Sequence, residues 1–187
     1  MPNWKKIIIP IFLLFFTLLI DGGITYLFRD QLNSSIGLMI PRLVIITLIM
    51  LAFYLDPKQL FILSFTFGFI YDSYYSGVLG VYIAAFVLIT YLVIQIRQII
   101  NPHFYAILLV NIVILTVMEV FVFGVYRGIG LSDLTLQFFL VDRLRGTLLF
   151  NTVVFLIIGY PLKEWMKVLV NTDENKTGKN KKSTSIR

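Results

Sequence analysis

The pentapeptide Ser76-Gly77-Val78-Leu79-Gly80 decides how this sequence folds, because it interrupts an apolar run that extends from residue 60 to residue 96. A helix needs about 20 residues to cross the hydrocarbon core of a bilayer, so the whole run is much too long for one crossing. Small residues of this kind are typical of a turn. The pentapeptide therefore predicts two membrane-spanning helices, at residues 60–77 and 78–96.

The composition of the chain extends this reading beyond the central pair. Of its 187 residues, 58% are hydrophobic and only 14% are charged, with a mean hydropathy of +0.88. Ordinary soluble domains contain roughly 25% charged residues. These values exclude a soluble globular protein and a disordered protein, and several spans of about 20 residues leave no room for a large catalytic domain.

Further apolar segments of spanning length flank the central pair on both sides. They lie at residues 7–27, 36–55, 104–126 and 139–161. The sequence thus predicts an all-α membrane protein with six transmembrane helices in one domain, residues 1–170. Residues 171–187 are polar and rich in Lys, Asn, Ser and Thr, so we expect a disordered basic cytoplasmic tail.

The basic residues near the ends of the spans predict the orientation of the chain. Most fall on one side if six helices alternate, and only Arg29 and Arg127 fall on the other. Because Lys and Arg concentrate on the cytoplasmic side, both termini are expected there. The first group comprises Lys5, Lys6, Lys58, Arg97, Lys163, Lys167, Lys176, Lys179, Lys181, Lys182 and Arg187. The net charge of +6 is thereby attributed to orientation and weak attraction to membrane lipid, and not to nucleic acid.

Besides Asp142 at the edge of the sixth span, six charged residues lie deep inside the predicted spans, where a charge costs a few kcal/mol and needs a reason. They are Asp21, Arg42, Asp72, Glu119, Arg143 and Arg145. All six fall in the external half of the membrane, with acids on odd-numbered spans and bases on even-numbered spans. We therefore expect mutual pairing in one layer. Such a layer either holds the helices in register or contacts a partner helix or ligand, and a proton relay through the three acids is a further alternative.

Small and polar residues recur every four positions near these charges, which places each row on one helical face. The rows are Thr17, Asp21 and Thr25; Ser64, Gly68, Asp72 and Ser76; and Arg143, Thr147 and Asn151, with Asn111 and Glu119 eight residues apart on the fifth span. Packed membrane helices use such faces for close approach and hydrogen bonds. We expect these rows to face the interior of the bundle.

The sequence offers little for catalysis. It has no cysteine and a single histidine, His103, and it contains no glycine-rich phosphate loop or serine nucleophile motif. We expect no enzymatic activity, no metal and no cofactor. Four tyrosines surround the outer turn, and they are interpreted as interfacial anchors or, alternatively, as a sugar- or ring-binding platform. They are Tyr71, Tyr74, Tyr75 and Tyr82.

The stretch GFIYDSYYSGVLG at residues 68–80 resembles the third span of the rod shape-determining protein MreD family. That family carries a glycine, an aspartate four residues later and a small-residue turn, and here Gly68, Asp72, Gly77 and Gly80 occupy those places. The resemblance implies a fold similar to the substrate-binding (S) components of energy-coupling-factor vitamin transporters. It also places the chain in the bacterial cytoplasmic membrane as a multi-pass protein.

The resemblance implies a non-enzymatic scaffold of the elongation machinery, which binds MreC directly and reaches MreB, RodA and a class B penicillin-binding protein through it. Such a scaffold helps direct peptidoglycan synthesis and so maintains cell shape. The candidate small-residue face packs either within the bundle or against MreC, and it comprises Ser64, Gly68, Asp72, Ser76 and Gly77. The alternative is a small-molecule-binding subunit of an energy-coupling-factor type vitamin transporter. The first span disfavours it, because it lacks the Ala-x-x-x-Ala docking motif of those subunits.

Overall fold

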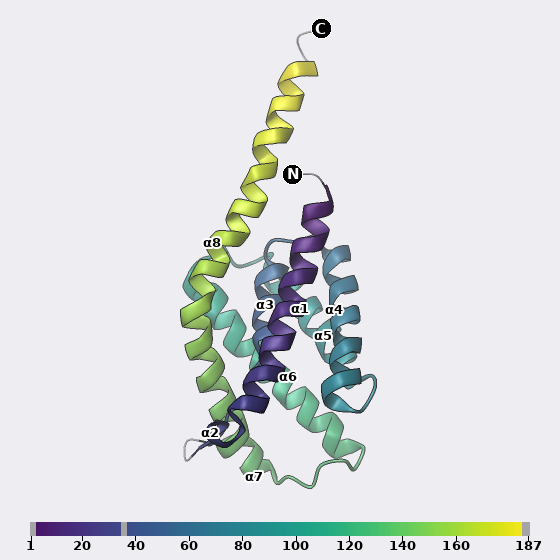
Figure 1. Ribbon diagram of the computed structural model, residues 1–187, viewed down its shortest axis with the longest axis vertical. Coiled ribbons are helices and arrows are strands. Elements are labelled where there is room, and N and C mark those ends of the chain that lie inside the picture. Colours follow the sequence, from purple (N-terminus) through teal and green to yellow (C-terminus); the bar gives the residue numbers. More distant parts are fainter. Residues whose placement is uncertain (1–2, 35–36, 185–187) are drawn as a thin grey trace.

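The computed structural model describes the backbone of residues 3–34 and 37–184, and the side chains of residues 7–32 and 37–166. Within these ranges the chain is helical except for connecting segments and one pair of two-residue antiparallel strands (Figure 1). The elements are α1 (Asn3–Leu27), α2 (Arg29–Leu32), β1 (Asn33–Ser34), β2 (Gly37–Leu38), α3 (Leu43–Ala52), α4 (Pro57–Tyr71), the π-helical turn η1 (Asp72–Ser76), α5 (Val81–Ile96), α6 (Phe104–Gly128), α7 (Leu136–Phe138), the π-helical turn η2 (Phe139–Leu144) and α8 (Arg145–Thr184).

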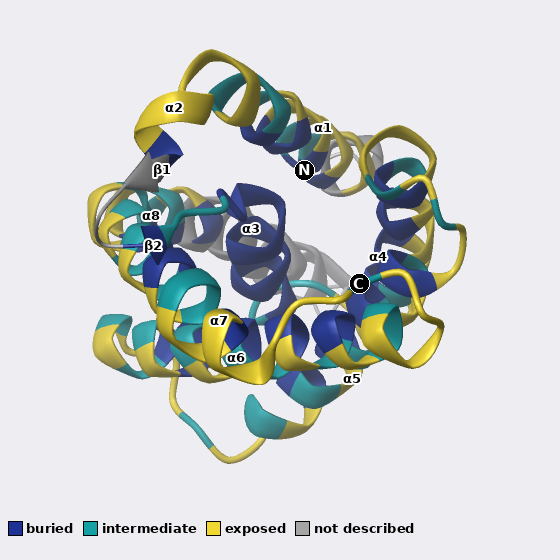
Figure 2. Cartoon of the chain, turned by 90° about the horizontal axis from the view of Figure 1, so that it is seen from below, coloured by how far each residue is buried: buried dark blue, intermediate teal, exposed yellow. Residues whose placement is uncertain are grey.

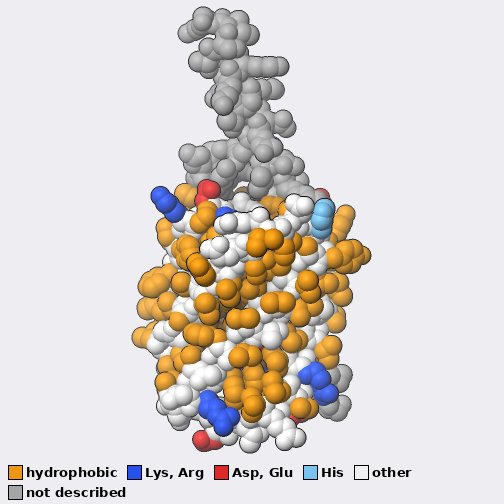
Figure 3. Space-filling view, turned by 180° about the vertical axis from the view of Figure 1, so that it is seen from behind, with side chains coloured by type: hydrophobic (Ala, Val, Ile, Leu, Met, Phe, Trp, Pro, Cys, Tyr) orange, Lys and Arg blue, Asp and Glu red, His pale blue; other side chains and the backbone are white. Residues whose placement is uncertain are grey.

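Among the residues whose side chains are described, three helical stretches are long and apolar enough to cross a membrane: Ile7–Leu27, Phe104–Gly128 and Leu136–Met166. The helices α3 and α5 are apolar but shorter. The first turn of α1 and the last turn of α8 lie at the same end of the bundle, with α2 and α7 at the other (Figure 1). On one flank, hydrophobic side chains cover the middle of the molecule and charged side chains lie near its ends (Figure 3). That distribution matches an apolar membrane between two aqueous phases.

The helices α4 and α5 form a tight antiparallel hairpin whose turn lies at residues 77–80, inside the predicted pentapeptide. Gly77 and Gly80 both have positive φ angles, +69° and +106°, which favour glycine. Gly68 lets the two helices approach closely, because a Cβ atom there would lie 2.7 Å from the Cα atom of Ile83. The face of α4 that carries Gly68 therefore packs against α5 inside the bundle.

The short helix α3 occupies the centre of the bundle, and all ten of its residues are buried (Figure 2). A helix that is apolar on every side belongs in a core. Ten residues rise only about 15 Å, half of what a crossing needs. The predicted helix at residues 36–55 is therefore wrong over residues 37–42. The described part of that stretch, residues 37–42, is strand β2 followed by non-helical backbone.

The reason for this interruption is local. Pro41 lacks an N–H group and disfavours helical geometry in the residue before it, so a helix can only begin after it. Gly37, with a φ of +128°, adds a second break upstream. Both residues were visible in the sequence as signals against a continuous span.

The C-terminal helix α8 continues to Thr184, across the segment for which the composition predicted no fixed structure. The side chains from residue 167 onward lie outside the described residues, as do those of Lys5 and Lys6. The division of the chain at residue 170 and the character of the tail therefore stay predictions.

Candidate functional site

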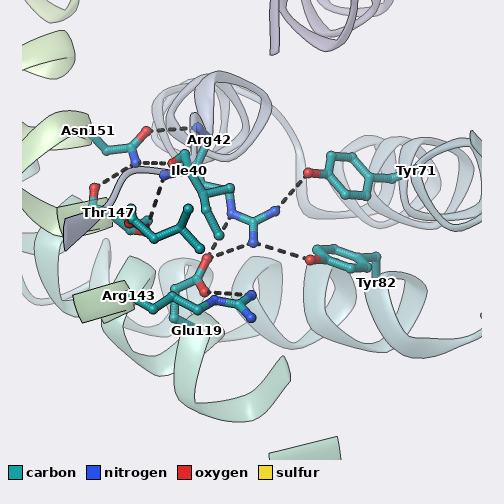
Figure 4. Close-up of polar contacts among 9 residues, drawn as sticks. Ile40, Arg42, Tyr71, Tyr82, Glu119, Arg143, Thr147 and Asn151 are labelled. Carbon is teal, nitrogen blue, oxygen red and sulfur yellow. Dashed lines mark hydrogen bonds and ion pairs between the residues drawn. The ribbon is translucent and has the colours of Figure 1, made fainter. Parts of the chain in front are cut away.

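Arg42 is the centre of a buried polar cluster, which we define as Arg42, Glu119, Tyr71, Tyr82 and Arg143 (Figure 4). The Arg42 side chain is only 2% exposed. Its Nε donates to Glu119 Oε1 at 2.8 Å and its Nη1 to the Tyr71 hydroxyl at 2.7 Å. Its Nη2 lies 2.7 Å from the same Glu119 oxygen and donates to the Tyr82 hydroxyl at 3.2 Å. The guanidinium thus uses all three of its nitrogens.

Glu119 is fully buried on α6, and its charge is shared by two guanidinium groups. Its Oε2 lies 3.3 Å from Nη2 of Arg143, which comes from η2. That distance is long, and Oε2 and the Arg143 Nε are both buried without a hydrogen-bond partner. Arg143 is therefore less well compensated than Arg42. Breaking a buried ion pair typically costs about 3–5 kcal/mol, so the cluster fixes α3 against α6.

Asp21 of α1 has a different task from the predicted pairing with arginine. Its two carboxylate oxygens accept from the backbone N–H groups of Leu43 and Val44, at 2.8 and 3.0 Å. These N–H groups belong to the first turn of α3, where they have no partner inside the helix and carry partial positive charge. Asp21 is 3% exposed. It caps the buried end of α3 from a neighbouring helix.

Asp72 performs the same task within the hairpin. It is fully buried and accepts from the backbone N–H groups of Gly80, Tyr82 and Ile83 at 2.8–3.2 Å. It therefore caps the first turn of α5 and holds the turn closed. The prediction that all the intramembrane carboxylates pair with arginines is wrong for Asp21 and Asp72. Backbone N–H groups at a helix N-terminus were the partners that the charge count left out.

The non-helical residues before α3 are supported by side chains of α8 (Figure 4). Asn151 accepts from the Arg42 N–H at 2.8 Å and donates to the Ile40 carbonyl at 2.8 Å. Thr147 accepts from the Ile40 N–H and donates to the Leu38 carbonyl, both at 3.3 Å. Backbone that leaves helical geometry at membrane depth is tolerated only when protein groups satisfy it. The predicted polar row on this helix supplies those groups.

The remaining predicted residues lie in several places. Arg145 is exposed and lies outside the buried cluster. Ser64 on α4 hydrogen-bonds to Thr90 on α5, and Ser76 hydrogen-bonds to the Tyr126 hydroxyl at 2.6 Å. Asn111 is buried, with neither atom of its amide partnered. The sequence interpretation of Tyr71 and Tyr82 as interfacial anchors or a platform missed their role, because nothing in their spacing showed that Arg42 lies between them.

The site is built for holding backbone and charge in place. Among the described residues, no group of three or more His, Asp or Glu side chains is placed to hold a metal ion. Two carboxylates are occupied by helix N-termini and the third by two arginines. This arrangement joins α1, α3, α5, α6 and α8 through buried polar contacts.

Comparison with known proteins agrees with this architecture. The family model described as rod shape-determining protein MreD matches residues 4–170. A protein named rod shape-determining protein MreD from Bacillus subtilis (strain 168) is 27% identical over 156 residues, which cover 81% of this chain and 91% of that protein. No solved structure matches the chain, so the expected similarity to transporter S components stays a prediction. The sequence-based family expectation is confirmed, and the chain belongs to the MreD family of rod shape-determining proteins.

Proposed function

We propose that this protein is a non-enzymatic integral-membrane scaffold of the bacterial elongation machinery, which binds MreC and helps direct peptidoglycan synthesis. RodA, a class B penicillin-binding protein and MreB are contacted through the complex. The observation that carries the proposal is membership of a family named for its role in rod shape. The geometry supports it, because the buried carboxylates are engaged in holding the bundle together.

The chain crosses the bacterial cytoplasmic membrane six times, with both termini in the cytoplasm. The second crossing combines the non-helical residues 37–42 with α3, and the third combines α4 with η1. Two observations support this topology. The helix α1 begins and α8 ends at the same end of the bundle (Figure 1). Arg97 lies at the C-terminal end of α3. Its Nη1 donates to the Ala52 and Leu55 carbonyls at 2.5 and 2.8 Å. A cation suits the negative C-terminal end of a helix, and it suits a cytoplasmic loop.

MreC binds in an apolar groove between α1 and α8. The groove has a volume of about 320 Å³, and α3 forms its floor through Leu43 and Thr47. The Thr47 hydroxyl is buried and has no partner. Of the three long spans, α1 buries the smallest share of its surface. Since Gly68 is occupied inside the hairpin, this groove replaces the face of Gly68 as the docking place for MreC's membrane helix.

Tryptophan substitutions in the groove test the proposal. Ile20 on α1 and Ile158 on α8 line it, and Ile62 on α4 is an exposed apolar residue outside it. We expect Ile20→Trp and Ile158→Trp to accumulate normally but to lose MreC on co-purification in mild detergent, and cells carrying them to round up. Ile62→Trp is the matched control and retains both. Equal recovery of MreC with all three variants would contradict the groove.

Depletion of the protein tests the wider function. We expect depleted cells to become round and to incorporate peptidoglycan over the whole surface. Normal cell shape after depletion would contradict the proposal.

A further inference from the structure

A polar pocket of about 240 Å³ lies near the C-terminal ends of η1 and α6. Four elements and the loop after α6 contribute to it. Its polar lining comprises Tyr75, Ser76, Tyr82, Tyr126, Ser132 and Arg143. The pocket adjoins the buried cluster, since Tyr82 and Arg143 belong to both.

Two π-helical turns from distant parts of the chain meet at this pocket. Tyr75 and Ser76 come from η1, and Arg143 comes from η2. Single π-turns are rare and frequently mark functional sites, because the wider turn redirects side chains. The turn η2 does not end a helix, since α8 continues directly from it.

The charge around the pocket is unbalanced. Arg42 uses its nitrogens on Glu119 and two tyrosine hydroxyls, whereas Arg143 has one long contact to the same carboxylate. The Arg143 side chain is 18% exposed, and its Nε is buried without a partner. No carboxylate is among the residues that line the pocket.

The neutral groups of the lining also favour an acceptor-rich ligand. The Tyr82 hydroxyl accepts from Arg42, which leaves its own hydrogen free to donate. The Ser132 hydroxyl also lines the pocket. Ser76 and Tyr126 offer no free hydrogen, because Ser76 donates to the Val78 carbonyl at 3.1 Å and accepts from the Tyr126 hydroxyl. Donors beside an under-compensated guanidinium are the usual chemistry of oxyanion recognition.

We propose that this pocket binds a phosphate-type oxyanion from the extracytoplasmic side, with Arg143 as its main cationic contact. This inference rests on the proposed topology, in which the ends of α6 and η1 face the extracytoplasmic side, so the oxyanion comes either from an anionic lipid headgroup or from a soluble phosphate. This site is separate from the groove between α1 and α8, and it does not depend on MreC binding.

Thermal denaturation of the full-length protein in a maltoside detergent tests the site. The probes are inorganic phosphate, at constant ionic strength against chloride, and phosphatidylglycerol, against a neutral glucosyl diacylglycerol. We expect at least one anionic probe to raise the denaturation midpoint of the wild-type protein. Arg143→Gln should weaken that binding about tenfold or more, since a charged hydrogen bond is lost. Arg145→Gln, an exposed arginine two residues away, is the matched control and binds normally.

A second variant protects the test against misfolding of Arg143→Gln. Ser132→Trp fills the pocket from the external loop and leaves the ion pairs untouched, so it should fold normally and lose the stabilisation. A response to phosphate alone assigns a soluble oxyanion, and a response to phosphatidylglycerol alone assigns a headgroup. The proposal is overturned if neither probe raises the midpoint, or if Arg143→Gln and Ser132→Trp respond as the wild type does.

Discussion

The hairpin of α4 and α5 and the interrupted second span, which consists of residues 37–42 and α3, both contain a buried helix N-terminus whose N–H groups need hydrogen-bond partners. The partners lie at very different distances along the chain. Each has a helix that begins inside the protein, and each uses a buried aspartate to accept from its first N–H groups. In the hairpin, Asp72 lies within 11 residues of its partners. In the interrupted span, Asp21 comes from another helix, and Asn151 lies 109 residues from the Arg42 N–H group.

The comparison shows what makes the centre of this bundle costly to disturb. The hydrogen bonds that Asp72 accepts in the hairpin turn all form within one local segment. The start of α3 depends on three other helices: Asp21 of α1 accepts from the Leu43 N–H group, Glu119 of α6 pairs with the Arg42 side chain, and Asn151 of α8 donates to the Ile40 carbonyl. We therefore expect substitutions around α3 to destabilise the whole protein more than substitutions in the hairpin.

Glu119→Gln should strongly destabilise the protein. It leaves the buried Arg42 guanidinium without its counter-charge, which costs about 3–5 kcal/mol. The measurement is the denaturation midpoint in detergent, together with the amount of folded protein in membranes. Arg145→Gln serves as the control, because Arg145 is exposed. A Glu119→Gln protein as stable as the control would show that the cluster does not hold the core.

Asp21→Ala and Asp72→Ala compare the two caps directly. Both leave buried N–H groups without a partner, at about 1–3 kcal/mol for each group. We expect Asp21→Ala to reduce folded protein at least as strongly, although it loses two hydrogen bonds and Asp72→Ala loses three. A milder effect of Asp21→Ala would mean that α3 does not depend on its distant cap.

Reversing the charge of Asp72 and of a buried arginine tests whether Asp72 is a helix cap or a member of an ion pair. Because Asp72 accepts from backbone N–H groups, Asp72→Arg should not be rescued by a reversal to glutamate at Arg42 or Arg143. Folded protein in membranes is the measurement. Restoration by either reversal would re-establish the ion pair that the charge pattern first predicted.

Gly68→Ala should have an intermediate effect confined to the hairpin. The new methyl group would lie 2.7 Å from the Ile83 Cα atom, and overpacking of this kind costs about 1–3 kcal/mol. Gly124→Ala is the matched control in α6, where a Cβ atom meets nothing within 4 Å. There the exchange should be neutral or stabilising by up to about 1 kcal/mol. Equal denaturation midpoints for both variants would contradict the close approach of α4 and α5.

Gly80→Ala should have the smallest effect. A Cβ atom has open space there, so the cost arises only from the positive φ of +106° and is about 1–3 kcal/mol at most. We expect a lower denaturation midpoint with unchanged MreC recovery. A loss of MreC without a change in stability would place the turn in the partner interface instead.

Much of the fold follows from the order of residues along the chain. The apolar runs predict helices of membrane length, and the pentapeptide at residues 76–80 predicts the turn of the hairpin. The segment at residues 68–80 indicated the family by its glycines and its aspartate. In the structure, Asp72 accepts from the Gly80 N–H group, and Gly68 lets α4 approach α5 within the same hairpin. Local constraints of this kind are readable from spacing alone.

The order of residues is enough to predict that the chain is helical, apolar and rich in intramembrane charges that need partners. The identity of those partners depends on how the helices pack. Glu119 lies 77 residues from Arg42, and Asn151 lies beside the backbone before α3 only because α8 packs there. Charge counting could not anticipate that two of the carboxylates serve helix N-termini, because the chain provides unpaired N–H groups only where a helix is interrupted. Pro41 predicts that the second span is interrupted, but the side chains that satisfy the interrupted backbone come from a helix distant in the sequence.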